Sequence, residues 1–351
     1  MKLEAMLKLK TGWASASGPH EAIILSSRVR LARNLSRQPF PPSAGPRTSG
    51  AVLDSAFAAC RKAKSLQGAA FVKLEDVEDL DRDFLVERRL ASPQFAADPK
   101  NRGVVVGDRE ILSVMVNEED HLRLQAVDSG LCLDALWKRV DVLDDELAPA
   151  LDFAFRSDWG YLTSCPTNTG TGMRVSALAH LTGLHLTGQL DRVLEGLGRL
   201  GMSIRGLYGE GTKVVGDFFQ ISNATAMGRS EPGLVFEVQR AVEGLLARET
   251  EARRNLSSGT QRLRLEDLVY RSVGLLSHAR SISFDETMQH LSSVRLAISL
   301  GWKVPVDVEA LNELLVLTQP AHIQMIARKE LGPEDRDFLR ATLLRRRFGA
   351  K

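Results

Sequence analysis

Strand signals stop near Leu256, and this switch constrains the fold more than any other feature of the chain. Before it, short apolar runs typical of strands alternate with helical patterns. After a polar stretch at residues 257–260, only helical patterns follow, over residues 265–278, 284–300, 307–317, 320–331 and 333–348. We therefore expect an α+β domain over residues 1–255 and an all-helical domain over residues 256–351.

A segment rich in glycine and threonine, residues 165–174, is the first candidate for a ligand site. It begins with Cys165, ends with Arg174, follows a short apolar run and precedes the helical pattern of residues 175–181. A turn that leads into a helix can bind an anion, because its free N–H groups and the helix dipole both favour negative charge. The alternative is that the glycines only turn the chain.

Two arginines alternate along an expected strand near the N-terminus. The apolar run of residues 22–25 continues through two serines into Arg28 and Arg30. In an extended chain these two arginines share one face, whereas Val29 and Leu31 take the other. The guanidinium groups need anions, which are either those of a ligand or the carboxylates of a solvated sheet edge.

A second row of polar side chains is expected in residues 117–125. From residue 119 onward the pattern has a period of two, with apolar residues on one face. The other face carries Glu119, His121, Arg123 and Gln125. A carboxylate, an imidazole and a guanidinium along one strand face form either the wall of a site or an exposed surface of mutual salt bridges.

Glycines surround Glu210 in a third segment. Gly206, Gly209 and Gly211 follow directly after Arg205. Because glycine frees the backbone, the segment is expected to be a mobile loop that closes over a ligand, or else a plain hairpin turn.

Composition excludes several classes of function. The chain has 351 residues with 46 basic and 44 acidic side chains, so its net charge of +2 gives no global field for nucleic acid or an acidic membrane. Its three cysteines are too few for a disulfide framework or a cysteine-rich zinc site. The N-terminus lacks a signal-peptide core and no run reaches transmembrane length, which predicts a cytoplasmic protein.

The familiar nucleotide and metal motifs are also missing, because the sequence contains neither Gly-x-x-x-x-Gly-Lys-Ser/Thr nor His-Glu-x-x-His. What remains is a set of arginines that each lie in a motif: Arg28, Arg30, Arg123, Arg174 and Arg205. Guanidinium groups bind phosphate oxygens through paired, charge-assisted hydrogen bonds, so the set predicts a polyphosphate ligand. With few spare carboxylates nearby, Mg²⁺ is expected to be carried mainly by the phosphates and water.

Taken in their order along the chain, the motifs resemble those of the ATP:guanidino phosphotransferase (phosphagen kinase) family. The resemblance spans residues 20–240 and includes Ser-Ser-Arg-Val-Arg at 26–30, Asn-Glu-Glu-Asp-His-Leu-Arg at 117–123 and Cys-Pro-Thr-Asn at 165–168. It implies a catalytic domain with an antiparallel sheet flanked by helices, which uses ATP and Mg²⁺. It also implies that Glu119 acts as the base on a guanidinium, that Cys165 lies beside the substrate nitrogens and that Glu210 holds the other side.

The same resemblance implies a set of ATP contacts. They are Ser26, Ser27, Arg28, Val29, Arg30, Arg89, Arg123, Arg174, Val175, Ser176, Ala177, Leu178, Arg205, Gly206, Leu207, Tyr208, Gly209 and Glu210. Arg89 is included because it stands where relatives often carry a histidine at the nucleotide.

Differences from the creatine and arginine kinases indicate which branch of the family the chain resembles. Those enzymes have a long helical domain before the Ser-Ser-Arg motif, with a loop that covers the small substrate, whereas only about 25 residues precede the motif here. A site without that lid admits an arginine side chain on a protein. The whole chain, with its helical tail, resembles the bacterial protein-arginine kinase branch of the family.

The resemblance to that branch implies further properties. A second, regulatory pocket that binds phosphoarginine is implied at Arg336, Asp337, Phe338, Leu339, Arg340 and Ala341. The branch also implies a homodimer formed through the helical domain, and protein substrates with exposed arginines that are marked for an ATP-dependent protease. A stress-gene (heat-shock) repressor that the enzyme inactivates and a zinc-finger activator protein are the other implied partners.

Two alternative functions stay open at this point. A kinase of free arginine or another small guanidino compound has the same chemistry, but the missing lid and the motif of residues 336–341 argue against it. A catalytically dead scaffold that binds phosphoarginine is disfavoured because Glu119, Cys165, Glu210 and all five arginines are present.

Overall fold

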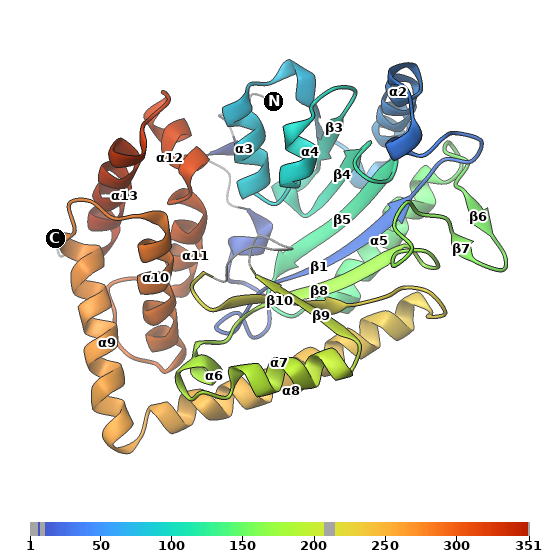
Figure 1. Cartoon of the computed structure of the whole chain (residues 1–351). Coiled ribbons are helices and arrows are strands. Elements are labelled where there is room, and N and C mark those ends of the chain that lie inside the picture. The colour runs from blue at the N-terminus through green and yellow to red at the C-terminus, as the bar shows by residue number, and fades with distance from the viewer. Residues whose placement is uncertain (1–5, 8–10, 207–214, 350–351) are drawn as a thin grey trace.

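The computed structural model describes residues 6–7, 11–206 and 215–349. In these residues eight strands form one antiparallel sheet, in the order β2-β3-β4-β5-β1-β8-β10-β9 (Figure 1). The strands are β1 (Ile24–Arg33), β2 (Ala70–Lys73), β3 (Gly103–Val106), β4 (Leu112–Val116), β5 (Leu122–Ser129), β8 (Met173–His180), β9 (Met202–Gly206) and β10 (Phe218–Asn223). A separate hairpin pairs β6 (Phe155–Arg156) with β7 (Gly160–Tyr161).

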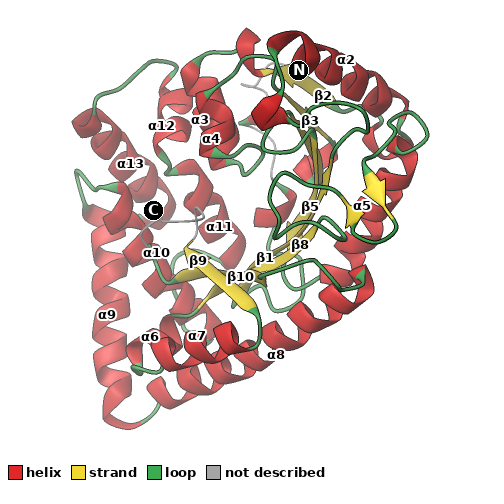
Figure 2. Ribbon diagram, turned by 45° about the vertical axis from the view of Figure 1, so that its right-hand side comes forward, coloured by secondary structure: helices red, strands yellow, loops and turns green. Residues whose placement is uncertain are grey.

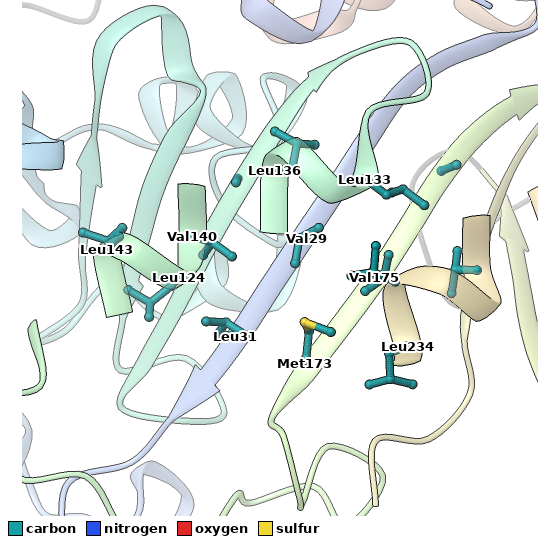
Figure 3. Packing of buried hydrophobic residues seen from close by; sticks show 14 of the residues in the cluster. Val29, Leu31, Leu124, Leu133, Leu136, Val140, Leu143, Met173, Val175 and Leu234 are labelled. Atoms are coloured by element: carbon teal, nitrogen blue, oxygen red, sulfur yellow. The ribbon is translucent and has the colours of Figure 1, made fainter. Parts of the chain in front are cut away.

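One face of this sheet carries the larger hydrophobic core. Alternation along β1, β5 and β8 directs Val29, Leu124 and Val175 to the same face. The helices α5 (Leu133–Leu147) and α8 (Glu231–Leu256) pack on that face, and Figure 3 shows the α5 side chains beside those of the strands. Because the apolar residues are at alternate positions, the intervening residues, such as Arg28 and Arg30 of β1, form the opposite face of the sheet.

The apolar run of residues 175–181 is not the helix that the sequence analysis predicts. Residues 175–180 lie in β8, which pairs with β1 on one side and β10 on the other. Nearly all of β8 is buried, and a strand buried on both faces has a continuous apolar run that periodicity does not distinguish from a helix. The segment of residues 165–174 therefore leads into a strand, and the expected helix dipole is not there to bind an anion. β9 is a further strand, which the sequence analysis did not predict, and it ends at Gly206, where the expected glycine-rich loop begins.

The other helices before residue 231 flank the sheet. They are α2 (Pro46–Lys62), α3 (Asp79–Glu87), α4 (Pro93–Ala97), α6 (Thr182–Leu186) and α7 (Leu190–Arg199). Short 3₁₀ segments complete the described elements: η1 (Gly12–Ala14), η2 (Pro41–Ser43), η3 (Lys64–Leu66), η4 (Leu74–Asp76) and η5 (Asp108–Glu110). No helix in the described ranges is both long enough and apolar enough to cross a bilayer.

The helices that follow α8 form what we call the helical region. They are α9 (Gly259–His278), α10 (Phe284–Ser299), α11 (Val308–Leu317), α12 (Pro320–Ala327) and α13 (Pro333–Phe348). Figures 1 and 2 show them at one end of the sheet. There Leu25, Val127, Leu178 and Phe218, from four strands, join one hydrophobic cluster with side chains of α10, α11 and α13. The predicted α+β fold, an antiparallel sheet flanked by helices and followed by helices alone, is confirmed.

Candidate active site

Arginines from several strands share the face of the sheet opposite the large core. Arg30 of β1 lies opposite Gln125 of β5 and Arg174 of β8. Residues directly opposite each other in an antiparallel pair share a face, and the same register places Arg123 and Arg205 on it. The structure thus brings together side chains that lie up to 175 positions apart (205 − 30) in the chain.

Neutral side chains hold some of these guanidinium groups in place. Arg174 donates to the Ser222 hydroxyl from Nε at 3.2 Å and from Nη2 at 3.1 Å, and Arg28 Nη2 donates to Gln220 Oε1 at 2.8 Å. Arg30 Nε, in contrast, is buried and has no hydrogen-bond partner in the described part of the chain. A buried donor without a partner costs free energy, so this face is suited to an acceptor that the chain itself does not supply.

Positive charges crowd the same face. Burial, followed by the charges of Arg89, Arg123 and Arg174, lowers the pKa of Arg28 from 12.5 to about 9. Burial and the nearby Arg28 place the pKa of Arg30 well below its usual value. We call Arg28, Arg30, Arg89, Arg123 and Arg174 the arginine cluster. Such a cluster is chemically suited to a polyanion whose charge is spread over several oxygens, because each oxygen can accept charge-assisted hydrogen bonds.

Arg89 joins the arginine cluster from outside the sheet. It follows α3 with a φ of 64°, a left-handed conformation that residues other than glycine seldom adopt. Its Nη1 donates to Ser26 Oγ at 3.3 Å, and its guanidinium carbon lies 4.5 Å from the centroid of the Trp13 ring. Gln125 Nε2 donates to the Arg89 carbonyl at 3.0 Å. These contacts fix Arg89 at the edge of the polar face.

The strand alternation predicted for residues 119–125 holds only in part. β5 begins at Leu122, so Glu119 and His121 lie in the turn after β4, where the chain reverses direction. His121 is fully buried there: its Nδ1 accepts from the Leu35 N–H at 3.0 Å, and its Nε2 lies 3.2 Å from the Pro39 carbonyl oxygen. His121 is therefore a structural residue of the turn and does not share a face with Arg123.

Glu119 lies between the arginine cluster and the loop that carries Cys165. Its side chain is 44% exposed, and its Oε1 is 3.5 Å from Arg123 Nη2. The same oxygen accepts from Asn168 Nδ2 at 3.3 Å. Cys165 Sγ lies 3.0 Å from Thr167 Oγ1 in that loop. The Glu119 carboxylate thus lies at one edge of the arginine cluster, and Asn168 links it to the loop that carries Cys165.

Buried polar side chains fix the loop of residues 162–172, which we call the Cys165 loop. Asp120 Oδ1 accepts from the Ser164 N–H at 2.7 Å, next to the turn that carries Glu119. Arg33 Nη1 donates to the Thr171 carbonyl at 2.9 Å, and the Arg33 guanidinium also pairs with Asp144 of α5 at 2.7 Å. These contacts hold Glu119 and Cys165 in a defined relative position.

The three cysteines have different environments. Cys60 is buried, and burial raises the pKa of its thiol to about 12. Burial, and then the charge of Asp128, raise the pKa of Cys132 to about 11. Cys165 is half-buried in its loop, in reach of solvent. Thiolates are the reactive form, so Cys60 and Cys132 are poorly suited to chemistry, and Cys165 is the candidate that is left.

Other predicted ATP contacts are divided between the two faces. Val29, Val175 and Ala177 pack in the large core, and Ser27 Oγ donates to the Gly130 carbonyl at 2.7 Å, away from the arginine cluster. Ser176 lies on the polar face opposite Arg28, as its register requires. Further along β8, Leu178 packs against the helical region. Gly206 ends β9, while Leu207, Tyr208, Gly209 and Glu210 lie outside the described residues.

The tail motif of residues 336–341 lies in α13. Arg340 is buried, and it donates from Nε to the Thr318 carbonyl at 2.7 Å and from Nη1 to the Ile282 carbonyl at 2.9 Å. It also pairs with Asp337 in the same helix. Phe338 is exposed, Arg336 and Leu339 are half-buried and Ala341 is fully buried. Within this motif, Arg340 is thus bound into the fold, and Arg336 and Phe338 are more accessible.

The sequence analysis missed several residues that line or support the site. Glu118 pairs with Arg123 and accepts from Ser92, whereas the sequence motif implied a role only for the neighbouring Glu119. Gln220 and Ser222 of β10 bind cluster arginines, and their period-two spacing could have placed them on one face. Arg33 lies on the apolar face of β1. A charge buried there needs a partner of opposite charge, which Asp144 supplies.

Acidification is expected to destabilise the turn that carries Glu119. Burial lowers the pKa of His121 below 6.5, and Nδ1 must be unprotonated to accept from Leu35. The unfolded chain therefore binds the proton more tightly, so stability falls as the pH drops below about 6.5. The melting temperature, measured from about pH 5 to pH 7, should show a shallower slope in His121→Asn than in wild type. The same substitution at exposed His278 should keep the wild-type slope.

Two family descriptions match the chain: "ATP:guanido phosphotransferase, C-terminal catalytic domain" over residues 52–252, and "Protein-arginine kinase McsB C-terminal domain" over residues 262–351. The protein-arginine kinase of Symbiobacterium thermophilum is 43% identical over 350 residues, 99% of each chain. That of Halothermothrix orenii is 41% identical over 336 residues, 96% of each chain. The solved duplicated taurocyamine kinase from Schistosoma mansoni superimposes with a TM-score of 0.62 and 25% identity, over 71% of this chain and 35% of that one.

Proposed function

Because this chain belongs to the ATP:guanido phosphotransferase family and, within it, to the protein-arginine kinases, we propose that its reaction takes place at the arginine cluster. The cluster binds the triphosphate of ATP, and the γ-phosphoryl group passes to a protein arginine held between Glu119 and Cys165. The observation that carries this assignment is the crowding of arginines around Arg30, whose Nε has no hydrogen-bond partner among the described residues. The exposed carboxylate of Glu119 lies beside one of these arginines, Arg123.

The proposed reaction needs three contributions from the chain. A guanidino nitrogen of the substrate attacks the γ-phosphorus, and the N–P bond forms as the bond to the bridging oxygen breaks and ADP takes its electron pair. A guanidinium is a poor nucleophile, so Glu119 aligns it and accepts its proton. The arginine cluster offsets the charge on the transferring group. Cys165 lies beside the cationic substrate, and Glu210 is proposed to hold its other side.

Mg²⁺ is the metal that we propose for this reaction. In the described residues no group of three or more histidine, cysteine, aspartate and glutamate side chains is arranged to hold a metal ion. The carboxylates closest to the cluster, Glu118 and Glu119, both contact Arg123. This donor set fits a cation that arrives on ATP, coordinated by phosphate oxygens and water, where it would neutralise phosphate charge.

The wider role is also part of the proposal. We propose that phosphorylation marks proteins for an ATP-dependent protease and inactivates a stress-gene repressor in the cytoplasm, with a zinc-finger protein as activator. Residues 1–255 form the catalytic domain, and residues 256–351 form a homodimer and bind phosphoarginine through the motif of residues 336–341. In that pocket the accessible Arg336 would contact the phosphoarginine. Arg340, which is hydrogen-bonded to the Thr318 carbonyl, would hold the surrounding backbone in position.

A two-substrate assay tests the proposed reaction. The enzyme is given ATP with a chemically unfolded, arginine-containing protein, with the same protein after every arginine is replaced by lysine, or with free arginine. We expect acid-labile phosphate on arginine side chains of the first substrate alone, located by mass spectrometry. Phosphorylation of free arginine alone would point to a small-molecule guanidino kinase. Binding of phosphoarginine without any turnover of ATP would point to a scaffold.

A further inference from the structure

A carboxylate of the sheet region caps a helix of the helical region. Glu87 is the last residue of α3, and its side chain is 12% exposed. Its Oε1 accepts from the Ala321 N–H at 2.7 Å, and its Oε2 accepts from the His322 N–H at 2.9 Å. His322 Nδ1, on a fully buried side chain, lies 2.6 Å from the same Oε2. One carboxylate thus binds three nitrogens at the start of α12.

α12 depends on this carboxylate for its capping. The first N–H groups of a helix have no partner within the helix, and the dipole favours a negative charge beside them. Gln319, the N-cap residue of α12, makes no capping hydrogen bond with its side chain. Glu87 therefore supplies from α3 what α12 lacks, through charge-assisted hydrogen bonds in a poorly solvated setting.

The end of α3 that carries Glu87 leads directly into the arginine cluster. Arg88, the next residue, is buried and donates from Nε to Glu110 Oε1 at 2.7 Å. Arg89 follows in its left-handed conformation, with its N–H bound to the Val86 carbonyl at 2.9 Å. Only Arg88 therefore separates the capping residue Glu87 from Arg89, whose guanidinium lies on the polar face. A change in the position of the α3 end is expected to move Arg89 as well. The two are joined by Arg88 alone, and the Arg89 N–H is bound to the Val86 carbonyl of α3 itself.

The helical region holds the other side of the cap. Thr318, just before the N-cap residue of α12, accepts from Arg340 of α13 through its carbonyl at 2.7 Å. Gln319 Nε2 donates to the Glu87 carbonyl at 3.5 Å, a long contact that lies along the same path. Buried and partly buried hydrogen bonds thus connect α13 with the start of α12 and the start of α12 with Glu87, two positions before Arg89.

We propose that Glu87 is a positioning residue for ATP binding, which keeps Arg89 in the nucleotide site by fastening the end of α3 to α12. The helical region then contributes to the nucleotide site of the sheet region indirectly, because α12 holds the end of α3 that carries Arg89. This inference rests on the proposed function in one respect, that Arg89 contacts ATP. It does not depend on the acceptor substrate.

The first measurement is ATP binding by titration, without turnover, in wild type and Glu87→Gln. The amide keeps the size of the side chain but loses the charge, and we expect the Kd and the KM for ATP to rise by about fivefold to twentyfold. The kcat at saturating ATP should stay near wild type, because the reacting groups are untouched. Glu78→Gln makes the same change at the exposed start of α3 and should have no effect. If Glu87→Gln does not fold, Glu87→Asp, which keeps the charge but is shorter, takes its place.

A double-mutant cycle then separates positioning from simple stabilisation. If Glu87 acts through Arg89, Glu87→Gln should change the Kd for ATP by less than about twofold in an Arg89→Ala background. Equal effects in both backgrounds, an effect on kcat alone or an unchanged Kd in Glu87→Gln would each overturn the proposal. An Arg89→Ala variant with normal ATP affinity would overturn it as well. The proposed function fails separately, if wild type binds ATP but phosphorylates no protein arginine.

Discussion

Glu119→Gln should lower kcat by about 10²- to 10⁴-fold, the contribution typical of a positioned general base. The amide oxygen can still accept from Asn168, so the loop and turn should keep their relative position. The amide cannot take a proton from the attacking guanidinium, so the chemical step is lost. The KM for ATP should change little, because Glu119 meets the arginine cluster only at its edge, 3.5 Å from Arg123. Single-turnover phosphorylation of an unfolded protein measures the effect.

Glu118→Gln is the matched comparison, with the same chemical change one residue earlier. Glu118 pairs with Arg123 and is less exposed than Glu119. Its loss should alter the position of Arg123 and raise the KM for ATP, with a smaller effect on kcat. Equal losses of kcat in both variants would show that the two carboxylates act as one electrostatic unit, and Glu119 would no longer be the assigned base.

The sequence was sufficient where alternation and burial agree. Arg28 and Arg30 alternate with Val29 and Leu31 in a strand whose apolar face packs on a helix, so one pattern fixed both the fold and the polar face. The switch to helices alone after α8 was equally clear, and α13 begins and ends at the predicted residues, Pro333 and Phe348. Local patterns decide these features, so they needed no knowledge of the tertiary structure.

Other features of the site depend on tertiary contacts that the sequence does not express locally. β8 resembles a helix in sequence because both of its faces are covered, one by α8 and the other partly by the helical region. His121 alternates with Arg123 in the sequence, but the turn buries it against Leu35. The capping of α12 by Glu87 joins residues 235 positions apart (322 − 87), and no periodicity predicts such a contact.

Arg30→Met should weaken ATP binding and also stabilise the ligand-free protein. Hydrogen bonds to charged groups contribute about 1.5–3 kcal/mol each, so loss of the guanidinium should raise the Kd for ATP by about 10- to 100-fold. Methionine retains an unbranched apolar side chain at this position. It removes a buried donor without a partner in the described residues and the repulsion by Arg28, Arg123 and Arg174. The melting temperature without ATP should therefore rise, while its increase on addition of ATP should shrink.

Salt dependence shows whether repulsion within the arginine cluster is the cause. Salt screens like charges, so the ligand-free wild type should gain more stability from added salt than Arg30→Met does. Arg199→Met removes the same charge from a side chain that is 83% exposed on α7, and it should leave ATP affinity and salt dependence unchanged. A lower melting temperature for Arg30→Met would mean that Arg30 stabilises the fold even without ATP. In that case the cluster would be a structural network, because a site held ready for a polyanion must be less stable while its charges are uncompensated.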